Sequence, residues 1–150
     1  MPQSHARVIV HAVFSTRSRD RVLTEDIQAE LFSYLAGVLR GEGHTPIAVG
    51  GHVDHVHILF GLGRTQSIAK IIERLKVSTS VWIKTKDGKW ADFHWQSGYG
   101  VFGISPKEID VTTAYIRNQK EHHREISFQE EFRVLLEEFG LDYDERYVWD

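Results

Sequence analysis

Residues 46–60, with the sequence PIAVGGHVDHVHILF, decide how this chain folds. The stretch is rich in β-branched and apolar residues, which predicts a strand or a bent pair of strands, and Gly50-Gly51 marks a bulge or a tight turn within it. Side chains two residues apart on a strand point to the same face, so His55 and His57 project side by side. The apolar side chains that face the opposite way are Val56, Ile58 and Phe60.

Strands and helices alternate on both sides of this stretch. Residues 6–15 predict a strand, and Thr24 is a typical N-cap for a helix that continues to Gly41. Residues 66–86 predict a second amphipathic helix. The two apolar stripes consist of Ile27, Leu31, Leu35, Val38 and Leu39, and of Ile68, Ile71, Ile72, Leu75 and Trp82. This alternation predicts the α+β class, a ferredoxin-like or RRM-like sandwich in which helices cover one face of a mostly antiparallel sheet.

The C-terminal half carries two helix-start signals. Residues Trp90–Ile104 alternate aromatic residues with glycines and predict a glycine-interrupted strand. Ser105-Pro106-Lys107-Glu108 then combines an N-cap serine, a proline at the first helical position and a glutamate that closes a capping box. Tyr115 lies well inside the helix that follows. The sequence Ser127-Phe128-Gln129-Glu130 repeats the capping signature and predicts a last helix up to Gly140.

Composition limits the class of protein. A chain of 150 residues is typical of one domain, so we expect residues 1–150 to form a single domain. The sequence has no apolar run long enough for a membrane helix and no signal-peptide pattern, which favours a cytoplasmic protein with no membrane partner. With no cysteine, thiolate metal sites are excluded.

Charge is distributed unevenly along the chain. Residues 1–90 carry 12 lysines and arginines against 8 acidic residues, whereas residues 91–150 carry 6 against 13. Arg17, Arg19 and Arg21 fall in one loop, which suits a local phosphate-binding face or an ordinary solvated surface.

Two imidazoles at the spacing of His55 and His57 can chelate one divalent ion, although a pair satisfied by ordinary hydrogen bonds fits the pattern as well. Tyr115 and Gln119 are four residues apart and share a helix face, which is consistent with a third neutral ligand beside a phenol. The phenol has an ordinary pKa of about 10, so a nucleophilic role needs a nearby cation or base. Asp54 is expected to face away from the pair and to play a structural or supporting role.

Three blocks, HVDHVHILF, WQSGYGVFGIS and AYIRNQKEHH, resemble the small single-tyrosine transposases of the HUH superfamily, including the REP-associated tyrosine transposases. The resemblance covers nearly the whole chain. It implies that His55, His57 and Gln119 bind Mg²⁺ or Mn²⁺ and that Tyr115 is the nucleophile. Ligand softness alone favours Mn²⁺ or Zn²⁺ over Mg²⁺ at two imidazoles.

The resemblance also implies a substrate and an assembly. The substrate is single-stranded DNA from an insertion-sequence end, recognised through a nearby hairpin, and cleavage leaves a 5′-phosphotyrosine and a 3′-hydroxyl. The implied assembly is a homodimer, in which the tyrosine helix of one subunit commonly completes the histidine site of the other. His122 and His123 match the end of the third block and serve either as helix caps or in catalysis.

Two other functions stay open at this stage. A domesticated nucleic-acid-binding protein of the same fold, non-catalytic or nicking, needs no strand transfer, and a metal-dependent hydrolase with an activated water leaves Tyr115 dispensable. Trp95, Tyr99 and Phe102 either stack on unpaired bases or belong to the core, and the core is the commoner role. The acidic segment from Glu125 to Asp150 is expected to be a structural helix with a partner contact.

Overall fold

A four-stranded antiparallel sheet forms the centre of the protein, as described by a computed structural model for residues 2–150. The strands lie in the order β2 (Thr45–Gly51), β3 (His55–Leu62), β1 (Val8–Ser15) and β4 (Gly100–Ile104). Every neighbouring pair is antiparallel. The predicted α+β class and antiparallel sheet are confirmed.

The stretch 46–60 forms a pair of strands. β2 and β3 are joined by three residues, and Gly51 pairs with Val56 across the hairpin. The register shifts between Pro46 and Ala48, at the start of β2, rather than at the two glycines. Of the two possibilities that the sequence leaves open, the bent strand pair is therefore the one observed.

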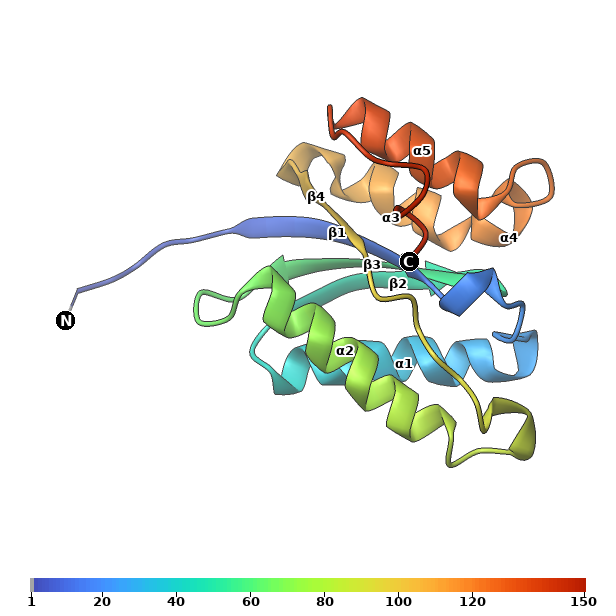
Figure 1. The fold of residues 1–150 in the computed structure, drawn as a ribbon. Coiled ribbons are helices and arrows are strands. Elements are labelled where there is room, and N and C mark those ends of the chain that lie inside the picture. Colours follow the sequence, from blue (N-terminus) through green and yellow to red (C-terminus); the bar gives the residue numbers. More distant parts are fainter. Residues whose placement is uncertain (1) are drawn as a thin grey trace.

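The helices α1 (Glu25–Gly41) and α2 (Ile68–Ile83) cover one face of the sheet (Figure 1). Their predicted stripes are buried there, with Leu31, Leu35 and Leu75 fully buried. The side chains that β3 contributes to this layer are Val56, Ile58 and Phe60, as predicted. Burial of this apolar area is the main stabilising contribution to the domain.

The opposite face is covered as well, by α3 (Ile109–Arg117), α4 (Gln119–His122) and α5 (Phe128–Glu138) (Figure 1). This second layer adds to the helical layer that the sequence led us to expect. Both predicted capping boxes are present, at Ser105 before a short 3₁₀ turn (Pro106–Glu108) and at Ser127 before α5. Apolar residues of α5 pack against Val13 and Phe102, so α5 is anchored to the centre and edge of the sheet.

The segment from Trp90 to Ile104 is mostly not a strand, so this prediction is wrong except for β4. Trp90 ends a 3₁₀ turn (Gly88–Trp90), and Trp95 makes a single bridge with Thr16. The aromatic side chains Trp90, Phe93 and Trp95 belong to the core between the sheet and the helices α1 and α2. The Nζ of Lys76 donates to the carbonyl oxygens of residues 96, 97 and 98 at 2.8, 3.2 and 2.7 Å, which takes the place of strand pairing.

The three aromatic residues considered for base stacking differ in burial. Trp95 and Phe102 are buried in the core, whereas Tyr99 is 39% exposed. Within residues 2–150, no helix combines the length and the apolar character that crossing a membrane requires.

Candidate active site

Two histidines at the start of β3 lie on the face of the sheet that α3, α4 and α5 cover. His55 and His57 are both completely buried. The Nδ1 of His57 lies 2.7 Å from the Nε2 of His11 on the neighbouring strand β1. Burial and the nearby His57 lower the pKa of His11 to about 3, so that His11 is neutral at physiological pH. No sequence pattern singled out His11, because a single histidine within an apolar strand has no distinctive spacing.

Asp54 fixes the orientation of His55. It lies in the turn before β3, and its Oδ1 accepts a hydrogen bond of 2.7 Å from the Nδ1 of His55. Burial works to raise the pKa of Asp54, but this hydrogen bond and the nearby imidazoles of His55, His123 and His52 together outweigh it and keep the pKa below its ordinary value. The expectation that Asp54 faces away from the histidines is wrong, because strand alternation does not extend into the turn. The Nε2 of His55 is thereby directed into the site.

Tyr115 and Gln119 reach the same place from two helices. α3 ends at Arg117, and Asn118, with φ −97° and ψ 19°, separates it from α4, so the expected single helix is interrupted. The Oε1 of Gln119 nevertheless lies 2.9 Å from the Nε2 of His55. The ring of Tyr115 stands edge-on to His57, with 5.6 Å between ring centroids. The four residues singled out in the sequence therefore converge within one chain.

Glu131 of α5 occupies the centre of this group. Its Oε1 lies 3.0 Å from the Nε2 of His57, 3.2 Å from the Nε2 of His123 and 3.5 Å from the Nε2 of His55. Only 2% of Glu131 is exposed. The acidic segment that was expected to form a structural helix thus places one carboxylate among the histidines.

The second carboxylate oxygen of Glu131 faces the tyrosine helix. It accepts hydrogen bonds from the hydroxyl of Tyr115 and, at 3.2 Å, from the Nε2 of Gln119. The Nε2 of His122 lies 3.2 Å away but makes no aligned hydrogen bond. One carboxylate therefore contacts both the histidine cluster and the phenol.

A signal for Glu131 was present in the sequence. In the helix that Ser127 caps, Glu131 falls between Phe128 and Leu135 at spacings of three and four residues. It therefore lies in the middle of the buried apolar stripe. A carboxylate at such a position is rarely buried without a partner, and this marks it as a functional candidate.

His123 closes a turn and also faces the site. Its Nδ1 donates to the carbonyl oxygen of Ile126 at 2.9 Å, which closes the turn after α4. Its Nε2 points into the cluster and lies 2.9 Å from the Oε1 of Gln119. His123 is thus a turn-closing residue whose second nitrogen faces the site.

Four of these side chains fit a metal ion. His55, His57, His123 and Glu131 each offer one ligand atom, and these atoms all lie within 4.8 Å of one another. Imidazole nitrogens and a carboxylate oxygen suit divalent ions such as Mn²⁺ and Zn²⁺. The cluster is therefore compatible with metal binding.

The charges around the phenol keep it protonated. Burial and the negative charge of Glu131 raise the pKa of Tyr115 well above its ordinary value. Burial works to raise the pKa of Glu131, but hydrogen bonds from His123 and His57, together with the electrostatic influence of His57 and His55, outweigh it and hold the pKa of this carboxyl well below its ordinary value. At neutral pH, an ionised carboxylate thus accepts a hydrogen bond from a neutral phenol.

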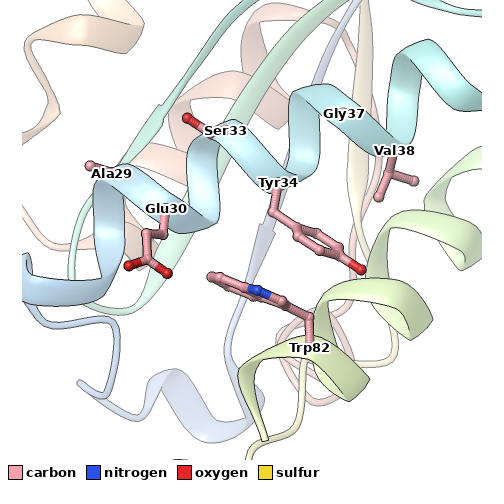
Figure 2. Close-up of a pocket in the computed structure, with 7 residues that line it drawn as sticks. All are labelled: Ala29, Glu30, Ser33, Tyr34, Gly37, Val38 and Trp82. Carbon is pink, nitrogen blue, oxygen red and sulfur yellow. The ribbon is translucent and has the colours of Figure 1, made fainter. Parts of the chain in front are cut away.

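A separate hollow of about 750 Å³ lies between α1 and α2 (Figure 2). Its walls include Tyr34 and Trp82, whose rings are stacked with 4.8 Å between centroids. The charged residue in its lining, Glu30, forms an ion pair with Lys86. This hollow lies on the other side of the sheet from Tyr115 and takes no part in the histidine cluster.

Comparisons with known proteins agree on one family. The model for IS200-like transposases matches residues 4–119. Comparison with curated proteins gives no match. Among solved structures, the chain is similar to a candidate transposase from Deinococcus radiodurans R1, with 22% identity, a TM-score of 0.61 and coverage of 79% of this chain and 98% of that chain.

A second similar structure is a REP-associated tyrosine transposase bound to a REP hairpin. The identity is 14%, the TM-score is 0.60, and the match covers 82% of this chain and 73% of that chain. At these identities, the two solved structures establish the fold. The family model spans most of the chain, and the protein therefore belongs to the IS200-like transposase family.

Proposed function

We propose that this protein cleaves and rejoins single-stranded DNA through a covalent bond to Tyr115, with Mg²⁺ or Mn²⁺ held by His55, His57 and Gln119. The observation that carries the proposal is the convergence of the Tyr115 hydroxyl and His57 on opposite oxygens of Glu131. Membership of the transposase family supports it. We also propose that residues 1–150 work as one domain.

In the proposed reaction, Tyr115 loses its proton and its oxygen forms a bond to the scissile phosphorus. The bond from phosphorus to the 3′-oxygen breaks, and that oxygen takes up a proton. A 5′-phosphotyrosine and a 3′-hydroxyl result, and the reverse attack rejoins strands without a nucleotide energy source. When bound, the metal would polarise the phosphate oxygens and orient the scissile bond.

Two hollows beside Tyr115 differ in the charged side chains that line them. One, of about 310 Å³, is lined by Tyr115 and three carboxylates, those of Glu108, Glu131 and Glu138. The other is lined by Tyr115 and Arg117 and contains no carboxylate. A phosphate is repelled by the first and attracted by the second. We therefore place the scissile phosphate on the Arg117 side of the phenol.

We propose single-stranded DNA with hairpin ends as the substrate. The similar REP-associated transposase is bound to a REP hairpin, and this chain shares its fold. A homodimer would bring two DNA ends together. Because Tyr115 and the histidines meet within one chain, we propose that each subunit uses its own tyrosine.

The decisive experiment incubates the protein with single-stranded hairpin oligonucleotides that carry randomised flanks, in Mg²⁺ or Mn²⁺. We expect an SDS-resistant adduct, and peptide mass spectrometry should locate it at Tyr115. Cleavage without an adduct would indicate a hydrolase that uses activated water. Hairpin binding with neither cleavage nor an adduct would indicate a non-catalytic binding protein, and either result would overturn the proposal.

A further inference from the structure

The hydrogen bonds around two imidazoles fix where their protons lie. The Nδ1 of His55 faces a carboxylate oxygen of Asp54, and the Nδ1 of His123 faces the carbonyl oxygen of Ile126. Both partners can only accept hydrogen bonds, so each Nδ1 carries the proton. In a neutral imidazole, the other nitrogen then has no proton and carries a lone pair. When these imidazoles are neutral, the Nε2 atoms of His55 and His123 face the site as acceptors.

These lone pairs meet further acceptors. Each of the two Nε2 atoms lies 2.9 Å from the Oε1 of Gln119. The amide cannot simply be reversed, because its nitrogen donates to Glu131 at 3.2 Å. The Oε1 of Glu131 faces the same two imidazoles. Such a group of acceptors is stable only around positive charge, supplied either by protons on the imidazoles or by a metal ion.

The spacing of these atoms matches that of ligands around one ion. For a metal bound at about 2.0–2.2 Å, neighbouring ligand atoms lie roughly 2.8–3.1 Å apart in octahedral geometry and roughly 3.3–3.6 Å apart in tetrahedral geometry. The Oε1 of Glu131 lies 3.0 Å from His57, 3.2 Å from His123 and 3.5 Å from His55. Glu131 is therefore already at ligand distance from its neighbours.

We propose that Glu131 is a ligand of the metal and at the same time the positioning residue for Tyr115. One oxygen faces the imidazoles and the other accepts the hydrogen bond of the phenol. This inference rests on the proposed function and adds to it a carboxylate from α5, beyond the residues 4–119 that the family model matches. The nucleophile and the metal are thereby joined through a single side chain.

The test measures Mn²⁺ binding to the full-length, metal-free protein by calorimetry. We expect Glu131→Gln, which keeps the shape and removes the charge, to weaken Mn²⁺ binding at least about tenfold. Glu131→Asp keeps the charge but shortens the side chain, so its Mn²⁺ affinity should lie between that of the wild type and that of Glu131→Gln. Glu137→Gln, an exposed change on the same helix, should bind Mn²⁺ like the wild type.

His57→Ala separates the two proposals. If His57→Ala keeps wild-type Mn²⁺ affinity, the metal role in the proposed function is wrong. The other outcome is that His57→Ala loses Mn²⁺ binding while Glu131→Gln binds Mn²⁺ as tightly as the wild type or more tightly. Glu131 then only balances the charge of the imidazoles in the metal-free protein, and the present inference alone is wrong. Circular dichroism of each variant verifies that it is folded.

The positioning role has its own readout. A defect in metal affinity alone is overcome by excess Mn²⁺, whereas a misplaced phenol stays slow at any Mn²⁺ concentration. We therefore expect Glu131→Gln to form the Tyr115 adduct at least about tenfold more slowly even when saturated with Mn²⁺. Full recovery at saturation would overturn the positioning role and leave the ligand role standing.

Discussion

Gly50 of β2 lies directly against Ile116 of α3, so closely that a β-carbon at Gly50 would come within 2.5 Å of the Ile116 carbonyl oxygen. Ile116 is the neighbour of Tyr115 in the sequence and is buried against the sheet. This contact sets the height of the tyrosine helix above β2. The phenol is therefore held in place partly by the absence of a side chain at Gly50 of β2.

Gly50→Ala should lift α3 from the sheet. We expect it to lower the free energy of unfolding by about 1–3 kcal/mol, because the added carbon meets backbone rather than a flexible side chain. Urea unfolding measures the change. Gly103→Ala on β4 is the matched control, since a β-carbon there meets nothing within 4 Å. Equal stability of the two variants would show that α3 is not held by this contact.

Tyr115→Phe removes one oxygen and little volume. We expect at least about a thousandfold loss of cleavage, with unchanged hairpin affinity, because the nucleophile is lost while the fold is kept. Gel assays of nicking and of hairpin binding measure both quantities. Tyr147→Phe, a change at a 63% exposed tyrosine, should behave like the wild type. A Phe variant that still nicks DNA would contradict the assignment of the nucleophile.

Arg117→Gln tests the side from which the phosphate approaches. Removing the guanidinium beside Tyr115 should reduce cleavage at limiting DNA concentration about tenfold, because a charge-assisted contact to phosphate is lost. Rates at limiting and at saturating DNA separate binding from chemistry. The control is Arg124→Gln, an exposed arginine that pairs with Glu121. Equal losses in both variants would indicate a general charge effect instead of a specific contact.

Metal affinity should rise with pH. Burial works to lower the pKa of His123, but its hydrogen bond and electrostatic attraction to Glu131, with the Ile126 carbonyl and Asp54, together outweigh this and raise the pKa above its ordinary value. In the metal-free protein, His123 therefore keeps its proton to higher pH, and Mn²⁺ has to displace it. Below that pKa, we expect affinity to fall by up to about tenfold per pH unit for this proton. Calorimetry at pH 6, 7 and 8 measures the slope, and His123→Gln should flatten it. An unchanged slope in that variant would assign the proton to another group.

Much of the fold was predictable because periodicity reports burial directly. The stripes of α1 and α2 and the apolar face of β3 depend only on local spacing, and the structure places them as expected. The segment 90–104 was not predictable, because its aromatics are buried without strand pairing and a distant lysine binds its carbonyls. No local pattern encodes such a contact.

The residues of the site were likewise only partly predictable from the sequence. The positions of His55, His57, Tyr115 and Gln119 followed from short spacings and from the family resemblance. His11 and Glu131 join them only through the tertiary structure, across 46 and 74 residues from His57. For Glu131, the position within an apolar stripe was the available clue, whereas His11 had none.

The capping box at Ser127 lies on the protein surface, yet it helps to hold the buried Glu131 in place. Ser127 and Glu130 fix the residue at which α5 begins, and Glu131 follows immediately. Without this cap, the first turn of α5 would fray, and Glu131, which lies in that turn, would be held less firmly in the histidine cluster. Loss of this exposed serine would therefore disturb the cluster while His55, His57, Tyr115 and Gln119 all stay in the sequence, and a comparison of those four residues alone would not reveal the change.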